Sequence, residues 1–203
     1  MLQTQTVVPD LLELLKRLMN EKLFSAFNLV GGTALALKIG HRNSIDIDLF
    51  GNSEIDVELF IEKLKTYGDV VVTQSSKNIL ITQINGIKVD FVNYKYPLLT
   101  NYWVEDTIRM VSTKDIAAMK LNAIAGRGSK KDFIDLFFLL QEFTLKEILS
   151  FYEEKYTDGS VFMVQKSLTY FEDADAQLQP KMYKGFDWEN CKKTILEEVI
   201  KLE

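Results

Sequence analysis

Two aspartates stand two positions apart in the segment Ile45-Asp46-Ile47-Asp48-Leu49. This strict alternation of apolar and acidic residues is typical of a β-strand, in which side chains at i and i+2 project from one face. Asp46 and Asp48 would therefore share a face, about 7 Å apart along the chain, while the Ile and Leu side chains anchor the other face. Carboxylates held in this way repel each other but are good hard oxygen ligands for Mg²⁺. The pair alone does not separate a metal site from a solvated strand face, where acidic pairs are also common.

A glycine pair precedes the aspartates, at the junction of a predicted strand and a predicted helix. It forms the segment Gly31-Gly32-Thr33. Backbone N–H groups at a helix start attract phosphate, and glycine lets a ligand approach the backbone closely. An ordinary tight turn, with Thr33 as the helix cap, explains the same residues, and both interpretations stay open.

A third carboxylate lies on a predicted hairpin. Asn85-Gly86 joins two alternating runs, and this dipeptide tolerates the positive φ angles of a type I′ turn. Asp90 lies on the second run, where Lys88 and Val92 share its face. One more carboxylate on a neighbouring strand is what a two-metal phosphoryl-transfer site requires.

From residue 112 onward the pattern becomes helical. Ser129 and Asp132 have the spacing of a capping box, so a structural role is favoured for Asp132 without excluding a functional one. Asp135 follows among apolar residues and, if buried, must pair with Lys120, Arg127 or a metal. Lys120 and Arg127 are seven residues apart and so lie nearly on one helical face, where they could bind a triphosphate or an RNA backbone.

The remaining periodicity places these residues on elements of an α/β N-terminal half and a helical C-terminal half. Helices are predicted at about 10–22, 54–67, 112–125, 129–140, from 144, at 160–172 and at 188–202, and strands at about 24–30, 45–49, 70–73, 78–84 and 87–94. The boundary between the halves is expected near residues 97–112, where Pro97 opens an irregular run.

These motifs resemble the DNA polymerase β-like nucleotidyltransferase superfamily, and within it the AbiEii/AbiGii toxin family. The resemblance rests on Gly31 to Leu37, His41-Arg42-Asn43-Ser44, Asp46 to Phe50, the looser match at Asp90, and a helical motif that includes Lys120, Asn122, Ala123, Arg127, Lys131, Asp132 and Asp135. Members of the superfamily often carry Gly-Ser where this chain has Gly31-Gly32, which leaves Thr33 to supply the hydroxyl.

The resemblance implies an α/β (α+β) fold. It implies a catalytic core with a mixed sheet and flanking helices at residues 1–100, and a helical domain that completes the active-site cleft at residues 101–203. It further implies NTP-dependent transfer of NMP to an acceptor hydroxyl with release of pyrophosphate. The acceptor would be an RNA such as a tRNA 3′ end, and a separately encoded antitoxin would counter the toxin.

The resemblance also implies roles for individual residues. Asp46, Asp48 and Asp90 would hold Mg²⁺ or Mn²⁺, and Gly31, Gly32 and Thr33 would receive the phosphates. Arg42 and Ser44 would steady the phosphates or the loop. Lys120 and Arg127 would bind phosphate charge, and Asp135 would hold one of these cations or assist proton removal.

Composition limits the class of partner. The formal net charge is −5, which excludes a protein that coats polyanions nonspecifically. The excess acid lies after residue 135, whereas residues 109–131 carry six basic side chains against one acidic side chain, so a cleft that admits an NTP and one RNA end is permitted. Lys114 and Lys130 are interpreted as solvated. The single Cys191, interpreted as a core residue, and the absence of a long apolar run predict a cytoplasmic protein that does not enter membranes.

Two alternatives stay open at this point. The chain could keep the nucleotidyltransferase fold without catalysis and use its cleft to bind a partner. It could also transfer a nucleotide to a small molecule or to a protein side chain.

Overall fold

One seven-stranded mixed sheet is present in residues 1–202, which the computed structural model of the chain describes. The strand order is β3-β4-β5-β2-β1-β7-β6. The strands are β1 (Asn28–Leu29), β2 (Asp46–Gly51), β3 (Val70–Ser75), β4 (Ile79–Ile84), β5 (Ile87–Asn93), β6 (Trp103–Glu105) and β7 (Ile108–Met110). The predicted mixed sheet with flanking helices is thereby confirmed.

Strands β2 and β5 lie side by side at the centre of the sheet and run parallel. The hairpin of β4 and β5 turns at Asn85 and Gly86, whose φ angles of 49° and 82° are those that the Asn-Gly dipeptide predicts. Because the side chains of a strand alternate, Ile47 and Leu49 of β2 are buried on one face and the two aspartates between them project to the other. Ile45, predicted to anchor the apolar face, instead precedes the strand and is exposed.

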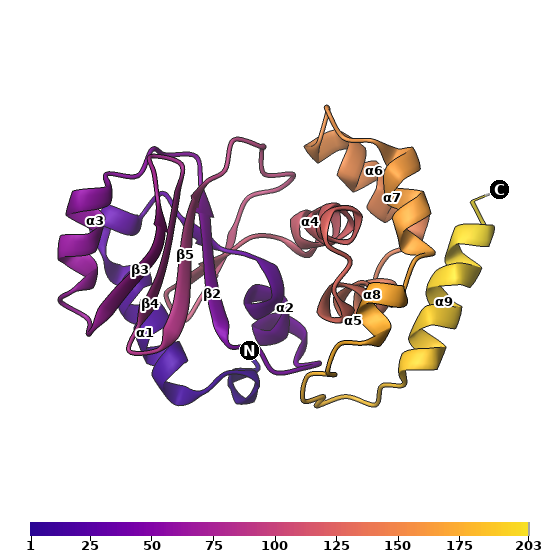
Figure 1. Ribbon diagram of the computed structural model, residues 1–203, viewed down its shortest axis with the longest axis horizontal. Helices are drawn as coiled ribbons and strands as arrows, with labels where there is room; N and C mark the ends of the chain where they lie inside the picture. The colour runs from indigo at the N-terminus through magenta and orange to yellow at the C-terminus, as the bar shows by residue number, and fades with distance from the viewer. Residues whose placement is uncertain (203) are drawn as a thin grey trace. The chain divides into compact units, whose positions relative to one another are not determined.

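Helices cover both faces of this sheet. Helices α1 (Pro9–Asn20) and α3 (Val57–Leu64) lie on one side of the strands and α2 (Gly31–Ile39) on the other (Figure 1). On the first side, Phe24, Phe27, Phe60 and Phe91 pack ring against ring, with centroids 4.8–5.8 Å apart. This apolar cluster is the core that fixes β2 and β5, so the face with the aspartates is left for polar chemistry.

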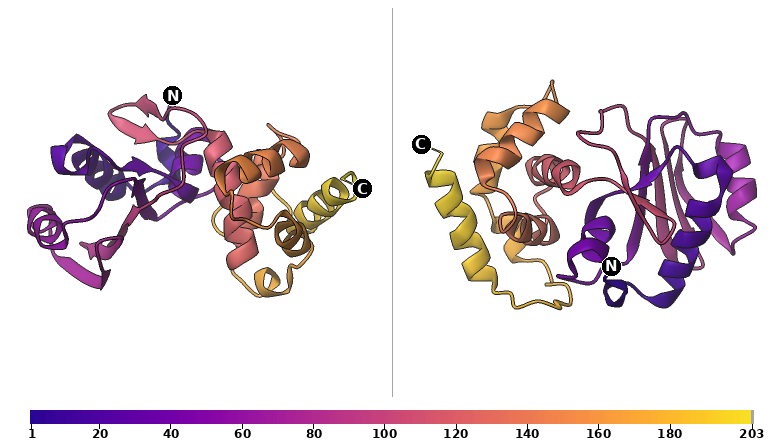
Figure 2. Two further views of the ribbon diagram at one scale, coloured as in Figure 1. Left: turned by 90° about the horizontal axis from the view of Figure 1, so that it is seen from above. Right: turned by 180° about the vertical axis from the view of Figure 1, so that it is seen from behind.

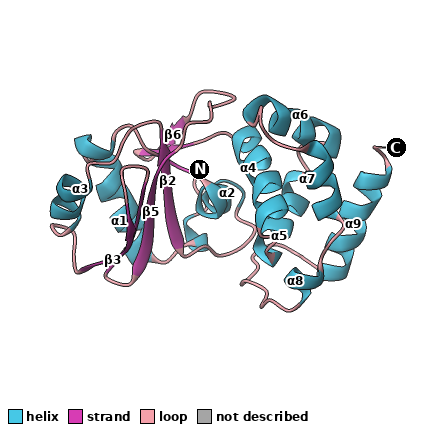
Figure 3. Cartoon of the chain, turned by 45° about the horizontal axis from the view of Figure 1, so that its top comes forward, coloured by secondary structure: helices cyan, strands magenta, loops and turns pink. Residues whose placement is uncertain are grey.

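The chain after β7 is helical. Its helices are α4 (Thr113–Gly126), α5 (Lys130–Leu139), α6 (Leu145–Lys155), α7 (Val161–Leu168), α8 (Glu172–Asp175) and α9 (Trp188–Ile200) (Figure 3). Side-chain caps begin several of them, because Ser112, Thr144 and Asp187 each accept a backbone N–H of the first turn. Helix α9 packs on α5 and α7 (Figure 2), where Cys191 is buried as predicted and burial raises the pKa of its thiol to about 12.

The chain divides into two compact units, and a short segment that separates the two parts of the first unit belongs to the second. Of the described residues, the first unit contains 1–96 and 102–111, and the second contains 97–101 and 112–202. Asp115 explains why residues 97–101 belong to the second unit: its buried carboxylate accepts the N–H of Leu99 at 2.9 Å and binds Lys155 at 2.8 Å. Lys155 Nζ in turn donates to the carbonyl of Pro97 at 2.6 Å.

Some element boundaries differ from those predicted. The strand expected at 24–30 is only Asn28–Leu29, because residues 22–24 form a 3₁₀ turn that places Phe24 in the aromatic cluster. The helix expected at 54–67 covers Val57–Leu64, since Asp56 caps it. Strands β6 and β7, at residues expected to be irregular, pair with each other at one end of the sheet. Of the helices in residues 1–202, none has the length and apolar character needed to span a membrane.

Candidate active site

Three aspartates project from one face of the central strands. Asp48 of β2 lies opposite Asp90 of β5 in the parallel register, and Asp46 lies opposite Lys88. Residues paired in this way point to the same side of a sheet. Asp46, Asp48 and Asp90 are all partly exposed, and Asp48 and Asp90 each lie between two buried neighbours. The three carboxylates that were predicted to bind metal therefore lie on one face of the sheet, on two adjacent strands.

Lys88 is the cation of this face. Its Nζ lies 2.6 Å from Asp90 Oδ2. Burial opposes the charged form of Lys88, but the hydrogen bond to Asp90 and the charges of the three aspartates outweigh burial and raise the pKa of Lys88 above its ordinary value. The alternation of residues along this strand predicts the face on which Lys88 lies, but no role was predicted for Lys88.

The carboxylates fit a hard divalent cation in type and in unused capacity. Asp90 Oδ1 is buried and accepts no hydrogen bond, although a buried carboxylate oxygen is normally paired. Across residues 1–202, no group of three or more His, Cys, Asp and Glu side chains is arranged to hold a metal ion. The three aspartates thus share a face, but the ion pair with Lys88 engages one of them, and the metal set stays a prediction.

The start of α2 lies directly beside Asp48. Gly31 has φ +67°, and a Cβ atom there would lie 3.0 Å from Asp48 Oδ2. Glycine is therefore required both by the backbone conformation and by the approach of the carboxylate. No side chain caps this helix end, so the first N–H groups of α2 are the donors that a helix leaves without an intrahelical partner.

Thr33 and Ser44 tie the start of α2 to the start of β2. The buried Thr33 hydroxyl donates to the carbonyl of Asp46. It also shares a hydrogen bond of 2.7 Å with the hydroxyl of Ser44. A hydroxyl has one proton, so Ser44 is the donor in this second bond. The hydroxyl of Thr33 is thus used within the protein and positions the strand of the aspartates.

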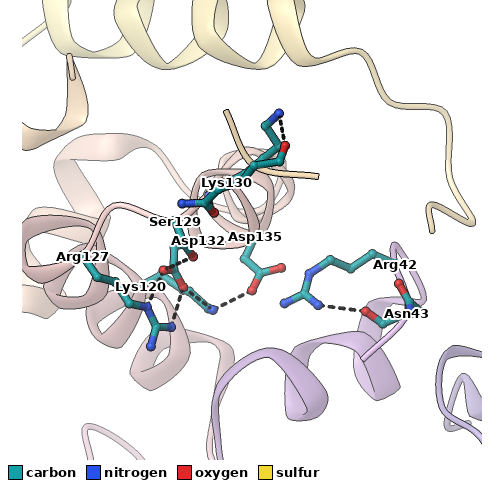
Figure 4. A network of polar contacts seen from close by, with 9 residues as sticks. Arg42, Asn43, Lys120, Arg127, Ser129, Lys130, Asp132 and Asp135 are labelled. Atoms are coloured by element: carbon teal, nitrogen blue, oxygen red, sulfur yellow. Dashed lines mark hydrogen bonds and ion pairs between the residues drawn. The ribbon is translucent and has the colours of Figure 1, made fainter. Parts of the chain in front are cut away.

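Arg42 lies against Gly32. A Cβ atom at Gly32 would lie 2.4 Å from Arg42 Nη2. The Arg42 side chain is buried, and its guanidinium donates to the carbonyl of Asn43 at 2.9 Å (Figure 4). A larger residue in place of the second glycine would therefore force the Arg42 guanidinium to move from the first turn of α2.

The second unit contains a buried charge cluster, which we call the Lys120 cluster: Lys120, Arg127, Asp132 and Asp135 (Figure 4). Lys120 Nζ lies 2.9 Å from Asp132 Oδ1 and 2.6 Å from Asp135 Oδ2. Both carboxylates are fully buried. A buried Asp135 was predicted to pair with Lys120, Arg127 or a metal, and the structure pairs it with Lys120.

Asp132 is the centre of the Lys120 cluster. Arg127 donates to both of its oxygens, at 2.9 and 3.1 Å, and Ser129 donates to one of them at 2.6 Å. Burial alone would raise the pKa of Asp132, but the charge of Lys120 and then the hydrogen bond and charge of Arg127 lower it well below its ordinary value. Ser129 is the residue before α5 but does not cap it with its side chain, so the role of Asp132 is to hold two cations rather than to complete a capping box.

Two basic side chains of residues 109–131 make internal contacts. Arg109 donates to the carbonyls of Met19, Phe24 and Phe27. Lys130, predicted to be solvated, is buried, because its Nζ donates to the carbonyls of Asp175 and Gln177 at 3.2 and 2.6 Å. Part of the basic excess of residues 109–131 therefore makes contacts within the protein and is not available to a ligand. The buried pair of Asp115 and Lys155 was missed, since no local pattern links residues 40 positions apart.

Comparisons with known proteins show which family this chain resembles. The family described as "Nucleotidyl transferase AbiEii toxin, Type IV TA system" matches residues 13–201. An uncharacterised protein of Aquifex aeolicus (strain VF5) is 41% identical over 171 residues, which cover 80% of this chain and 82% of that protein.

Two solved structures have the same fold. JHP933 from Helicobacter pylori superposes with a TM-score of 0.60 at 16% identity, covering 95% of this chain and 88% of that one. MenT4, a nucleotidyltransferase toxin of Mycobacterium tuberculosis H37Rv, superposes with a TM-score of 0.57 at 15% identity, covering 96% and 83%. At these identities the likeness shows the fold, while the family match extends over most of the sequence. The chain belongs to the AbiEii family of nucleotidyltransferase toxins.

Proposed function

We propose that this chain transfers NMP from an NTP to an acceptor hydroxyl, with release of pyrophosphate, in a reaction that depends on Mg²⁺ or Mn²⁺. The observation that carries the proposal is the position of Asp48, which lies in register with Asp90 on the neighbouring strand and beside Gly31 at the uncapped start of α2. Carboxylates for a metal and N–H donors for phosphate thereby meet at one place.

Asp46, Asp48 and Asp90 are the proposed metal ligands. When bound there, Mg²⁺ or Mn²⁺ supplies positive charge that offsets the charge of the phosphate oxygens. The protein's own part is to hold the carboxylates rigidly, which the buried neighbours of β2 and β5 and the bond from Thr33 to the carbonyl of Asp46 accomplish. The buried Asp90 Oδ1, which accepts no hydrogen bond, supports this assignment.

The first turn of α2 is the proposed phosphate site. The backbone N–H groups of Gly31, Gly32 and Thr33 point along the helix axis at its positive end and favour an anion. Arg42 adds a guanidinium next to Gly32. Ser44 acts indirectly, because its hydroxyl holds Thr33 and so the turn.

Residues of the Lys120 cluster are proposed to act on phosphate through Lys120 and Arg127. Arg127 is the more accessible of the two, with 68% of its side chain exposed against 6% for Lys120. Asp135 is then a positioning residue for Lys120, since it lies 2.6 Å from the ammonium. Removal of the acceptor proton by Asp135 is the second role that we propose to test.

The proposed acceptor is an RNA, such as a tRNA 3′ end, and the proposed partner is an antitoxin protein. Membership of a toxin family supports both. The RNA proposal is also consistent with the low overall charge of the protein, because recognition of one RNA end does not require a large basic surface.

Incorporation of each labelled NTP into total cell RNA, total protein or aminoglycosides tests the reaction and its acceptor. We expect label in RNA with the wild-type protein and Mg²⁺, and a decrease of about 1,000-fold in Asp46→Asn, because a metal contributes several kcal/mol to the transition state. Asp69→Asn is the matched control, since Asp69 is exposed and lies outside the site. Label in protein or in a small molecule would replace the RNA proposal.

A catalytically silent protein of the same fold is the alternative function. It would bind NTP without incorporation, so an NTP with Mg²⁺ would raise the thermal midpoint while no acceptor gained label. An Asp46→Asn variant as active as the wild type would contradict the proposed metal site directly.

A further inference from the structure

Lys88 occupies an unusual position for a lysine in a metal-dependent site. It pairs with Asp46 in the strand register and lies two residues before Asp90 on the same strand. Its side chain is therefore on the face of the three carboxylates, and its ammonium bonds Asp90 Oδ2 at 2.6 Å. A charge-assisted hydrogen bond of this kind is roughly twice as strong as a neutral one, so it influences how Asp90 can bind a cation.

The charges on this face explain why a cation is present. Three carboxylates on one face of two neighbouring strands repel one another, and the register places the Lys88 ammonium among them. One divalent cation would supply more charge to the same oxygens than the ammonium does, so the two cations compete for one place.

Exposure shows which member of the ion pair can move. The Lys88 side chain is 42% exposed, whereas that of Asp90 is 13% exposed and lies between the fully buried Val89 and Phe91. Asp90 is fixed by the core, while the ammonium stands at the end of a flexible stem that reaches solvent.

We infer that Lys88 acts as a built-in counter-ion of the active site: it offsets the charge of the aspartates of β2 and β5 without metal, and its ammonium at Asp90 opposes the binding of a divalent cation by the same carboxylate. The inference rests on the proposed function. Lys88 thereby sets the metal affinity of the site and is a positioning residue, not a ligand.

Direct Mn²⁺ binding, followed by the paramagnetic resonance of free Mn²⁺, tests this inference without any turnover. In Lys88→Met we expect Mn²⁺ to bind about tenfold more tightly than in the wild type, the factor that corresponds to the loss of one charged hydrogen bond. Lys88→Arg keeps the charge and should bind within about twofold of the wild type. Lys77→Met removes a lysine from the exposed ion pair with Glu54 and is the matched control, with no expected change.

The outcomes separate this inference from the proposed function. Binding that is lost in Asp46→Asn but is equal or weaker in Lys88→Met would keep the metal site and overturn the role of Lys88. The absence of Mn²⁺ binding in both the wild type and Lys88→Met would overturn the metal site itself. Lys88→Gln repeats the measurement with a polar side chain at this half-exposed position, and a thermal midpoint near that of the wild type verifies that each variant is folded.

Discussion

Two clusters of carboxylates and basic side chains in this protein differ in burial and in charge balance. The Lys120 cluster has as many cations as carboxylates, and its two aspartates are fully buried. On the sheet, three aspartates share a partly exposed face with Lys88, and a buried oxygen of Asp90 accepts no hydrogen bond. The first cluster has satisfied its charges internally, whereas the second retains capacity for a cation. We infer that the buried ion pairs of the Lys120 cluster stabilise the fold and position Lys120 and Arg127, and that the partly exposed set on the sheet is the one suited to binding a metal ion.

The largest effect that separates the clusters is expected in the unfolding free energy. Asp132→Asn removes one carboxylate from two cations and leaves a buried ammonium less compensated, so we expect a loss of about 3–5 kcal/mol. Urea denaturation at neutral pH measures it. A loss below about 1 kcal/mol would mean that the Lys120 cluster is not the structural element described above.

Acid should weaken the same cluster. The folded-state pKa of Asp132 lies below its unfolded value, so its contribution is fully present above the unfolded pKa of about 3.9 and is lost as pH falls below that value. The stability difference between wild type and Asp132→Asn should be constant from about pH 7 to pH 5 and then shrink by up to about 1.4 kcal/mol per pH unit. Urea titrations at several pH values test this, and a difference that is unchanged at acid pH would contradict it.

A glycine-to-alanine substitution in each unit compares how much stability each unit loses when a methyl group is added. Gly32→Ala would push a methyl group onto the buried Arg42, so we expect a cost of about 1 kcal/mol and weaker NTP binding. Gly126 is the last residue of α4, and a Cβ atom there would meet open space. Gly126→Ala should therefore leave the unfolding free energy unchanged or raise it by up to about 1 kcal/mol. Denaturation curves with and without NTP measure both, and equal effects would remove the special role of Gly32.

The smallest stability effect is expected at Asp90. Its ion pair with Lys88 is partly exposed, so Asp90→Asn should change the unfolding free energy by less than about 1 kcal/mol without metal. The same variant should lose Mn²⁺ binding, because a proposed ligand is gone. Thermal melts with and without Mn²⁺ measure both quantities, and a loss as large as that in Asp132→Asn would erase the contrast between the clusters.

Local signals predicted much of this structure. The Asn85-Gly86 turn, the helix starts near residues 112 and 144, and the alternation around Asp46 and Asp48 each depend on neighbouring residues, and each is found where it was predicted. These signals were enough to place three aspartates on one face of a sheet.

What the sequence could not predict depends on distant partners. Lys130 has the spacing of a solvated helix residue, yet carbonyls more than 40 positions away bury it. The strand expected at 24–30 shortens because Phe24 and Phe27 pack with Phe60 and Phe91. For Lys88, sequence gives the face but not the choice of Asp90 as its partner, which depends on side-chain geometry.

That residues 97–101 belong to the second unit has a consequence for the order of folding during synthesis. The sheet cannot be complete until β7 has left the ribosome, since β7 pairs with β1. Residues 97–101 emerge before β7, but the ammonium that holds them belongs to Lys155. The carbonyl of Pro97 in this stretch therefore lacks its Lys155 partner while more than 50 further residues are translated. A chain stalled after β7 has left the ribosome but before Lys155 has done so would carry a finished sheet with residues 97–101 not yet fixed, and these residues would be fixed last.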